Sequence, residues 1–259
     1  MSVPNNSITP NSSRSDAYYL QGAATTIEVS RNMDITAFAS YRKIDATLNK
    51  DGTIKTLLKT GYHRTESEMQ RKQNASQTTT GGNIRWHSGG WHVGLTGVYT
   101  AYSDSLKPDK RQAYRKYNPT GIHFYNTSVD YGYINHRVNI NGETAINDKG
   151  AVATINAIAL KASQSLTLTA IQRFYSYRYY SMFSAAFSDG GKVQNESGIY
   201  LGAMWTPSSR LSVLAYSDYA YFPWARYLVS EKSHSWDNLI QASYRLSPLL
   251  TLNSRYRLR

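Results

Sequence analysis

The chain has 259 residues and no cysteine, which excludes disulfide frameworks, thiol catalysis and cysteine-bound metals. Its mean hydropathy is −0.52, and no stretch approaches the roughly 18 consecutive apolar residues that a membrane-spanning helix requires. The formal net charge of +12 favours polyanionic partners such as nucleic acid or lipopolysaccharide phosphates, although lysine and arginine are also ordinary in the loops of β-barrels.

Residues 1–16 are polar and rich in serine and asparagine, which predicts a disordered leader. They contain neither a basic n-region nor an apolar h-region, so they do not form a signal peptide. We expect the remainder, 17–259, to form a single β-domain. The final residues, 255–259, stop in the middle of a predicted strand, and we therefore expect a fragment of a longer protein that is incomplete at its C-terminus.

Small polar turns recur along the chain and separate runs of about ten residues that alternate apolar and polar side chains. Six such turns lie at Arg31-Asn32, Ser88-Gly89-Gly90, Asn135-His136-Arg137, Ser163-Gln164-Ser165, Ser208-Ser209-Arg210 and Ser247-Pro248. The strands that they join are expected at about 18–30, 33–48, 77–87, 91–102, 122–134, 138–148, 151–162, 166–177, 197–207, 211–221, 235–246 and 249–258.

Strands of this length are typical of membrane barrels, because a strand tilted by about 45° needs roughly 9–11 residues to cross the hydrocarbon layer. Strands of soluble proteins average about 5–6 residues. Short turns at one end and long polar loops at the other complete the pattern. The sequence therefore predicts an all-β, antiparallel, up-and-down transmembrane β-barrel with about twelve strands present, part of a larger barrel in a bacterial outer membrane.

The segment 53–76 interrupts the alternation. Residues 65–73 are good helix formers, and Thr65 with Glu68 has the spacing of a capping box, which predicts one short helix in a loop. We expect this helix to lie over or inside the barrel mouth, where Glu66 and Glu68 would reach arginines of the lumen. Deleting 65–73 would then raise the single-channel conductance.

The two faces of the expected strands differ in polarity. Trp91, Val93 and Leu95 lie on one face of their strand, and His92 and Thr96 lie on the other. The polar faces carry eleven ionisable side chains that we expect to face the lumen: Glu28, Arg85, His92, Asp130, Glu143, Arg173, Asp218, Asp237, Arg245, Arg255 and Arg257. A dry core cannot hold so many charges, whereas a water-filled or plugged lumen can. A soluble sheet with one solvated face is the alternative.

Tyrosine and tryptophan contribute 22 and 5 residues against 6 phenylalanines. This bias favours an aromatic girdle at the membrane interfaces, although tyrosine also forms strands well in any sheet. The loop 103–121 carries five basic residues that we expect to contact polyanions: Lys107, Lys110, Arg111, Arg115 and Lys116. Tyrosines interleaved with arginine over 173–180 suit either base stacking or the girdle.

Motifs of catalysis and metal binding are absent from the sequence. The six histidines have no metal-ligand spacing, and there is no nucleophile elbow, P-loop or dinucleotide fingerprint. We therefore expect no catalytic residues, no metal, no cofactor and no enzymatic activity.

Four phrases resemble a known family. They are Tyr19-Leu20-Gln21-Gly22-Ala23-Ala24, Ser40-Tyr41-Arg42-Lys43, Gly61-Tyr62-His63-Arg64-Thr65-Glu66-Ser67-Glu68 and Phe222-Pro223-Trp224-Ala225-Arg226-Tyr227. They resemble the barrel portion of large Bacteroidota outer-membrane proteins that carry an N-terminal helix-hairpin-helix region, similar to that of competence DNA-binding proteins. The resemblance implies DNA handling at the cell surface. The helix-hairpin-helix part is missing here, so its DNA-binding role falls on no residue of this sequence.

The expected function is that of a conduit or receptor scaffold in the outer membrane. Expected partners are the lipid bilayer, lipopolysaccharide, the barrel-assembly machinery and, through loops or a missing N-terminal region, nucleic acid. The alternative is a soluble all-β binding module of a surface or extracellular protein. Arginine introduced at Leu95, Val213 or Leu252 separates the two, because it would cost about 2–4 kcal/mol at a lipid midplane and little in water.

Overall fold

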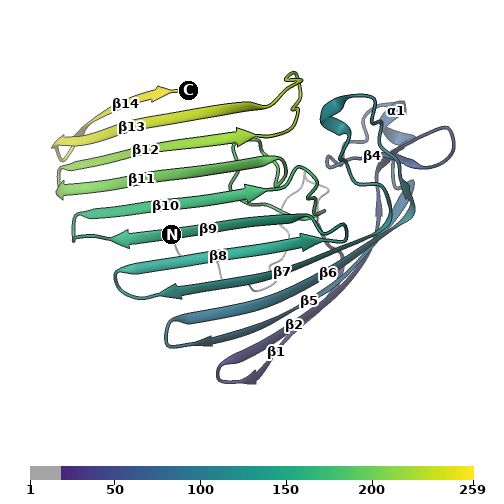
Figure 1. Ribbon diagram of the computed structural model, residues 1–259, viewed down its shortest axis with the longest axis horizontal. Coiled ribbons are helices and arrows are strands. Elements are labelled where there is room, and N and C mark those ends of the chain that lie inside the picture. The colour runs from purple at the N-terminus through teal and green to yellow at the C-terminus, as the bar shows by residue number, and fades with distance from the viewer. Residues whose placement is uncertain (1–18) are drawn as a thin grey trace. The chain divides into compact units, whose positions relative to one another are not determined.

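The structure is a computed structural model that describes residues 19–259, so the predicted leader 1–16 lies outside the described residues. The fold is all-β, as predicted, with 64% of the chain in one antiparallel sheet of 14 strands (Figure 1). The main path of the sheet has the order β1-β2-β5-β6-β7-β8-β9-β10-β11-β12-β13-β14, and β3 and β4 pair beside it. Sequential strands are therefore neighbours along nearly the whole path, which is the predicted up-and-down order.

The elements have the following bounds. The strands are β1 (Gly22–Ser30), β2 (Met33–Ile44), β3 (Ala46–Leu48), β4 (Ile54–Leu57), β5 (Ala75–Ser88), β6 (Trp91–Leu106), β7 (Gly121–Ile134), β8 (Val138–Asn147), β9 (Val152–Lys161), β10 (Leu166–Tyr175), β11 (Glu196–Ser208), β12 (Leu211–Phe222), β13 (Ser233–Ser247) and β14 (Leu250–Leu258). The helical turns are α1 (Glu66–Met69) and η1 (Ala113–Arg115).

Contacts between Cα atoms divide the described residues into two compact units. The first comprises 19–86 and Gly94–Thr127, and the second comprises His87–Val93 and Ser128–Arg259. The first unit contains the N-terminal strands, α1 and η1. The second contains β8 to β14 and the loops that connect them.

The predicted turns join neighbouring strands at one end of the sheet. The turn between β5 and β6 illustrates the local cause, since Gly89 and Gly90 have φ angles of 56° and 88°. Two-residue hairpins favour such positive φ angles, which glycine adopts without steric cost. The turn at Arg31-Asn32 likewise joins β1 to β2 in antiparallel register, with Met33 opposite Ser30.

The strand expected over 33–48 is interrupted at Asp45, and a small hairpin of β3 and β4 follows. The carboxylate of Asp45 accepts a hydrogen bond from the backbone N–H of Gln73 at 2.8 Å and contacts His63 Nε2 at 2.7 Å. These contacts tie the start of the hairpin to the segment that contains α1. The alternation of the sequence carries no sign of this tertiary anchor.

The predicted loop helix is present but shorter than expected, over Glu66–Met69. Thr65 is its N-cap, and the capping box with Glu68 is complete, because each side chain accepts a hydrogen bond from the other residue's backbone N–H. Four residues form a single helical turn, so the remaining residues up to Gln73 follow as turns.

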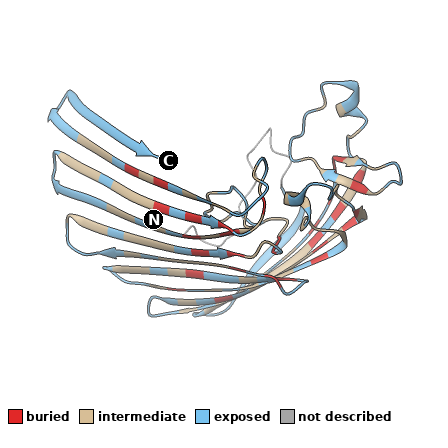
Figure 2. Cartoon of the chain, turned by 45° about the horizontal axis from the view of Figure 1, so that its top comes forward, coloured by how far each residue is buried: buried red, intermediate tan, exposed pale blue. Residues whose placement is uncertain are grey.

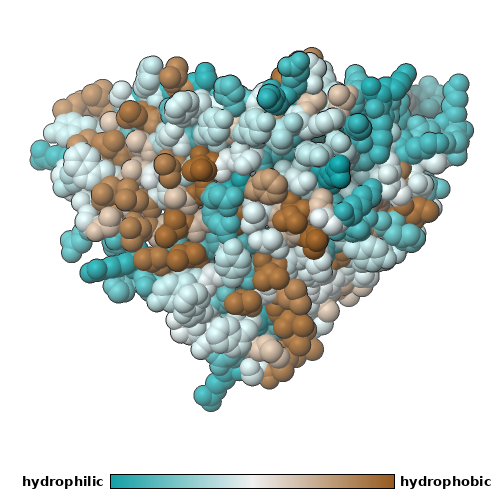
Figure 3. Space-filling model, in the orientation of Figure 1, coloured by the Kyte–Doolittle hydropathy of each residue, from teal (hydrophilic) through white to brown (hydrophobic). Residues whose placement is uncertain are grey.

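The strands of the second unit expose an apolar face. Alternate residues of β10 and β13, such as Leu168, Phe174, Trp236 and Ile240, are between 40% and 60% exposed. Other exposed apolar side chains in this unit are Ile140, Ile146, Val152, Ile158, Leu160, Ile199, Leu201, Trp205, Tyr219, Tyr221, Tyr244, Leu246, Leu250, Leu252, Tyr256 and Leu258. In Figure 3 hydrophobic residues gather at the left of the view, where Figure 1 draws β9 to β12.

The opposite face of the same strands contains the buried residues. Figure 2 shows them concentrated towards one end of β10 to β13. A small apolar cluster there consists of Ala151, Ala153, Tyr175 and Tyr179. The neighbouring buried residues on β10 to β13 include four charged side chains, which form the candidate site: Arg173, Glu196, Asp218 and Asp237. Apolar side chains of Ala220, Phe222 and Leu239 are buried beside them.

Candidate functional site

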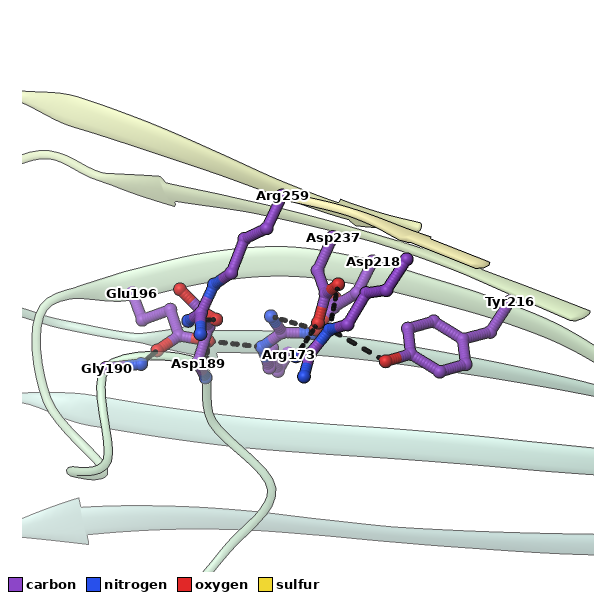
Figure 4. Close-up of polar contacts among 9 residues, drawn as sticks. Arg173, Asp189, Gly190, Glu196, Tyr216, Asp218, Asp237 and Arg259 are labelled. Atoms are coloured by element: carbon purple, nitrogen blue, oxygen red, sulfur yellow. Dashed lines mark hydrogen bonds and ion pairs between the residues drawn. The ribbon is translucent and has the colours of Figure 1, made fainter. Parts of the chain in front are cut away.

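The candidate site is a belt of charged side chains across five consecutive strands, which we name the charged belt. It consists of Arg173 on β10, Glu196 on β11, Asp218 on β12, Asp237 on β13 and Arg257 on β14 (Figure 4). Each side chain lies on the face opposite the exposed apolar residues, because side chains alternate between the two faces of a strand. Period-two alternation in five strands therefore places these five charged side chains on one face of the sheet.

Arg173 is the centre of the charged belt and is fully buried. Its Nε forms an ion pair with Glu196, which is also fully buried. Its two terminal nitrogens donate to both carboxylate oxygens of Asp218, at 2.8 and 3.2 Å. One guanidinium thus neutralises part of the charge of two carboxylates, in the forked geometry that arginine provides.

Gly198 allows the Arg173 side chain to reach across β11. Gly198 is the residue of β11 directly opposite Arg173, and a Cβ atom added to it would lie 2.6 Å from the Cζ atom of Arg173. A side chain at this position would occupy the space of the guanidinium. The absence of a side chain therefore lets one arginine span from β10 to Asp218 on β12.

The loop between β10 and β11 covers the buried end of the charged belt. Glu196 accepts hydrogen bonds from the backbone N–H groups of Asp189 and Gly190, at 2.9 and 2.8 Å. The ring of Phe187 lies 4.9 Å from the Arg173 guanidinium carbon, and the Phe187 carbonyl accepts a hydrogen bond from Tyr175 at 2.8 Å. Arg173 and Glu196 therefore contact residues of the covering loop as well as residues of the strands.

A second ion pair extends the charged belt to the last two strands. Arg257 Nε donates to Asp237 Oδ1 at 2.8 Å, and the hydroxyl of Tyr216 donates to Asp237 Oδ2 at 3.3 Å. Beyond the end of β14, the guanidinium of Arg259 contacts the carboxylate of Asp189 in the covering loop at 2.9 Å. Figure 4 shows Tyr216 directed towards Asp237, and Arg259 directed towards Asp189 of the loop.

The structure brings together six of the eleven residues that the sequence assigned to a lumen. Arg173 pairs with Asp218, Arg257 with Asp237, and His92 lies 3.8 Å from Asp130. Ion pairs are absent within the described residues for the other five, which are Glu28, Arg85, Glu143, Arg245 and Arg255. Four of those five are exposed, and Arg85 is half-buried.

The sequence patterns do not predict Glu196, Asp189 or Arg259 as site residues. Glu196 opens β11, one residue before the expected strand start, so the alternation predicts it as part of a loop. Its position two residues before Gly198 and four before Tyr200 is the available signal, because residues two apart share a face. Asp189 and Arg259 belong to irregular segments, where no periodicity exists to place them.

The expected role of Glu68 receives no support from its contacts. Its carboxylate accepts hydrogen bonds from the backbone and side chain of Arg64, at 2.7 and 3.2 Å, and from the Thr65 backbone. These bonds hold the pKa of Glu68 below its usual range, with the Arg64 side chain as the largest cause. Glu68 thus serves the cap of its own helix, and a link between 65–73 and pore conductance stays a prediction.

The basic residues expected to contact polyanions divide into two groups. Lys107, Lys110 and Arg111 line a surface groove with residues of the β3–β4 turn. Arg115 and Lys116 lie at η1, where the Arg115 guanidinium is 5.2 Å from the Tyr114 ring and the Lys116 ammonium is 5.9 Å from the Tyr117 ring. The tyrosines of this loop therefore contact cations of the chain itself.

Comparisons with known proteins assign this chain to no family. Neither the protein-family models nor the curated proteins contain a match to this chain. Among residues 19–259, no helix has the length and apolar character needed to cross a membrane. The described part of the chain also holds no group of three or more acidic, histidine or cysteine residues placed to bind a metal ion. The resemblance to Bacteroidota proteins stays a prediction.

Proposed function

We propose that the chain is a segment of an outer-membrane β-barrel that acts as a conduit or receptor scaffold. The observation that carries the proposal is the contrast between the two faces of β10 to β14. One face exposes large apolar side chains such as Leu201 and Ile240, and the other buries Arg173 and Glu196. In a soluble sheet the apolar face is covered by a core. Here lipid would cover the apolar side.

The charged belt then belongs to the inside of the barrel. Charged side chains facing a lumen are ordinary in outer-membrane barrels, where lipid-facing and lumen-facing residues alternate along each strand. The loop between β10 and β11 packs over Arg173 through Phe187 and over Glu196 through Asp189, so it would narrow a channel at that level. A charged, partly occluded inner surface suits selection of polar cargo.

A barrel places one further requirement on the strands. Every strand in a membrane barrel has paired neighbours on both sides, because unpaired backbone groups are too costly in lipid. The outer edges of β1 and β14, which end the main path of the sheet, therefore need partner strands in the membrane. In the proposed barrel, of which this chain is a segment, neighbouring strands on both sides would supply this pairing.

Cell fractionation tests the proposal. The chain is expressed with an export signal and the outer membrane is separated from the soluble fractions. We expect the protein in the outer-membrane fraction, extractable only with detergent, and with heat-modifiable migration on a gel. Recovery as a soluble, monodisperse protein without detergent would contradict the proposal and favour the soluble binding module.

A further inference from the structure

A basic groove lies in the first unit, between the β3–β4 turn and the loop that follows β6. We name it the basic groove. Its lining residues are Asn49, Lys50, Asp51, Lys55, Lys107, Pro108, Asp109, Lys110 and Arg111. Five of these side chains are cationic and two are anionic, so the groove has an excess of positive charge.

Hydrogen bonds to the backbone of Lys107 connect the two walls of the basic groove. The side-chain amide of Asn49 donates to the Lys107 carbonyl at 3.1 Å, and the backbone N–H of Lys107 donates to the Ile54 carbonyl at 2.8 Å. Ile54 is fully buried and forms a parallel bridge with Leu106. The backbone positions of the two walls are therefore fixed before any ligand arrives, which lowers the entropic cost of binding.

The two carboxylates of the basic groove orient cations. Asp51 contacts the Lys107 ammonium at 2.9 Å, and Asp109 contacts the Arg111 guanidinium at 2.6 Å. Hydrogen bonds, chiefly from Thr53, hold the pKa of Asp51 well below its usual range, and those from Arg111 do the same for Asp109. Lys55 lies close enough to Asp109 to add to this lowering.

We infer that the basic groove binds the phosphate groups of lipopolysaccharide. Lysine suits a phosphate because its ammonium is a compact point charge, and four lysines line the groove beside Arg111, whose guanidinium also donates to Asp109. The lining residues include no aromatic side chain, so the groove lacks the stacking platform that single-stranded nucleic acid uses. This chemistry favours a lipid phosphate over a nucleic acid.

The position of the basic groove fits this ligand. It lies beyond the end of β6 and of the β3–β4 hairpin, at the opposite end of β2 from the short turn at Arg31-Asn32. In outer-membrane barrels the longer loops face the cell exterior, where lipopolysaccharide forms the outer leaflet. The choice of lipopolysaccharide rests on the proposed function, whereas binding of phosphate does not.

Binding to lipid A in nanodiscs tests the inference with a matched pair of variants. The full chain is refolded in detergent, and its affinity is measured for nanodiscs with bis-phosphorylated lipid A and with dephosphorylated lipid A. The double variant Lys55→Gln with Lys107→Gln removes two groove cations. The double variant Arg115→Gln with Lys116→Gln removes the same charge from η1, outside the groove.

We expect preference for the phosphorylated lipid and a loss of about tenfold or more in the groove variant, because two charge-assisted contacts are removed. The η1 variant should keep most of the affinity. Asp51→Asn should bind more tightly than the unsubstituted chain, since it removes a repulsive carboxylate. Heat-modifiable migration on a gel verifies that each variant is folded.

Three results would overturn the inference. They are equal losses in the groove and η1 variants, equal affinity for the phosphorylated and dephosphorylated lipid, or tighter binding of a single-stranded DNA oligonucleotide than of lipid A. Failure of the proposed function is a separate outcome. A soluble protein that still binds phosphorylated lipid A would refute only the barrel, and a membrane-inserted protein that does not bind would refute only the groove.

Discussion

Arg173 on β10 and Glu196 on β11 form an ion pair in which neither side chain is exposed to solvent. Asp218 completes the arrangement from β12. Burial makes each member dependent on the others, because an unpaired charge in a low-dielectric environment is costly. Removing Arg173 should therefore lower the free energy of unfolding more than removing an exposed charge does.

Arg173→Leu should destabilise the folded chain by about 3–5 kcal/mol, since it leaves Glu196 and Asp218 buried without their cation. Urea unfolding of the refolded protein in detergent, followed by tryptophan fluorescence, measures the change. Arg245→Leu is the matched control, because Arg245 lies on the same face but is exposed, and it should have little effect. Adding Glu196→Gln and Asp218→Asn to Arg173→Leu should recover part of the loss. Equal stability of the two single variants would contradict the role of the buried pair.

Gly198→Ala should also destabilise the fold, by about 1–3 kcal/mol, because the new methyl group meets the Arg173 guanidinium. Gly97→Ala provides the control. Its added Cβ atom would meet nothing closer than 3.8 Å, at a methyl group of Thr127. The same unfolding experiment compares the two variants. If Gly97→Ala proved the more harmful, the passage of Arg173 across β11 would not depend on glycine.

Glu68 makes the stability of α1 depend on pH. Because hydrogen bonds from Arg64 and Thr65 lower its pKa in the folded chain, the stabilisation is present above the ordinary glutamate pKa of about 4.3. It is lost as the pH falls through the lowered folded value. Hydrogen exchange at the Glu68, Met69 and Gln70 amides should therefore lose protection in acid, relative to intrinsic exchange rates. Glu68→Gln should show the weaker protection already at neutral pH, and unchanged protection of the unsubstituted chain in acid would exclude this cap.

Arginine substitutions probe the exposed apolar face. Leu95 and Leu252 are 52% and 61% exposed, and Val213 is half-buried on the same face of β12 as Tyr219. Each change to arginine should cost about 2–4 kcal/mol when the site lies near the bilayer midplane, and less near the interfaces. Unfolding from lipid vesicles gives the cost. Neutral effects at all three positions would favour a face in water and hence a soluble module.

The sheet was predictable because two local signals agree along most of the chain. Turn residues such as Gly89-Gly90 mark the ends of strands, and the alternation of side chains marks their faces. The β3–β4 hairpin was not predictable, because the break at Asp45 depends on hydrogen bonds with Gln73 and His63, which are distant in sequence. Local patterns carry no information on such anchors.

The charged belt was predictable only where its members lie inside regular strands. Arg173, Asp218, Asp237 and Arg257 follow from period-two alternation. Their pairing depends on the register of β10 to β14, which the sequence does not specify. Glu196 depends in addition on where β11 begins, and a shift of one residue at a strand end decides whether a side chain is counted at all.

The most direct test of the central claim is the environment of adjacent residues on β10 and β13 in a bilayer. The chain lacks cysteine, so Leu168→Cys, Thr169→Cys, Ile240→Cys and Gln241→Cys each provide a single labelling site. A nitroxide at each site reports its accessibility to oxygen, which concentrates in hydrocarbon, and to a water-soluble nickel complex. A membrane barrel predicts oxygen access at Leu168 and Ile240 and nickel access at Thr169 and Gln241. Nickel access at all four positions would contradict a lipid-facing sheet and the outer-membrane barrel with it.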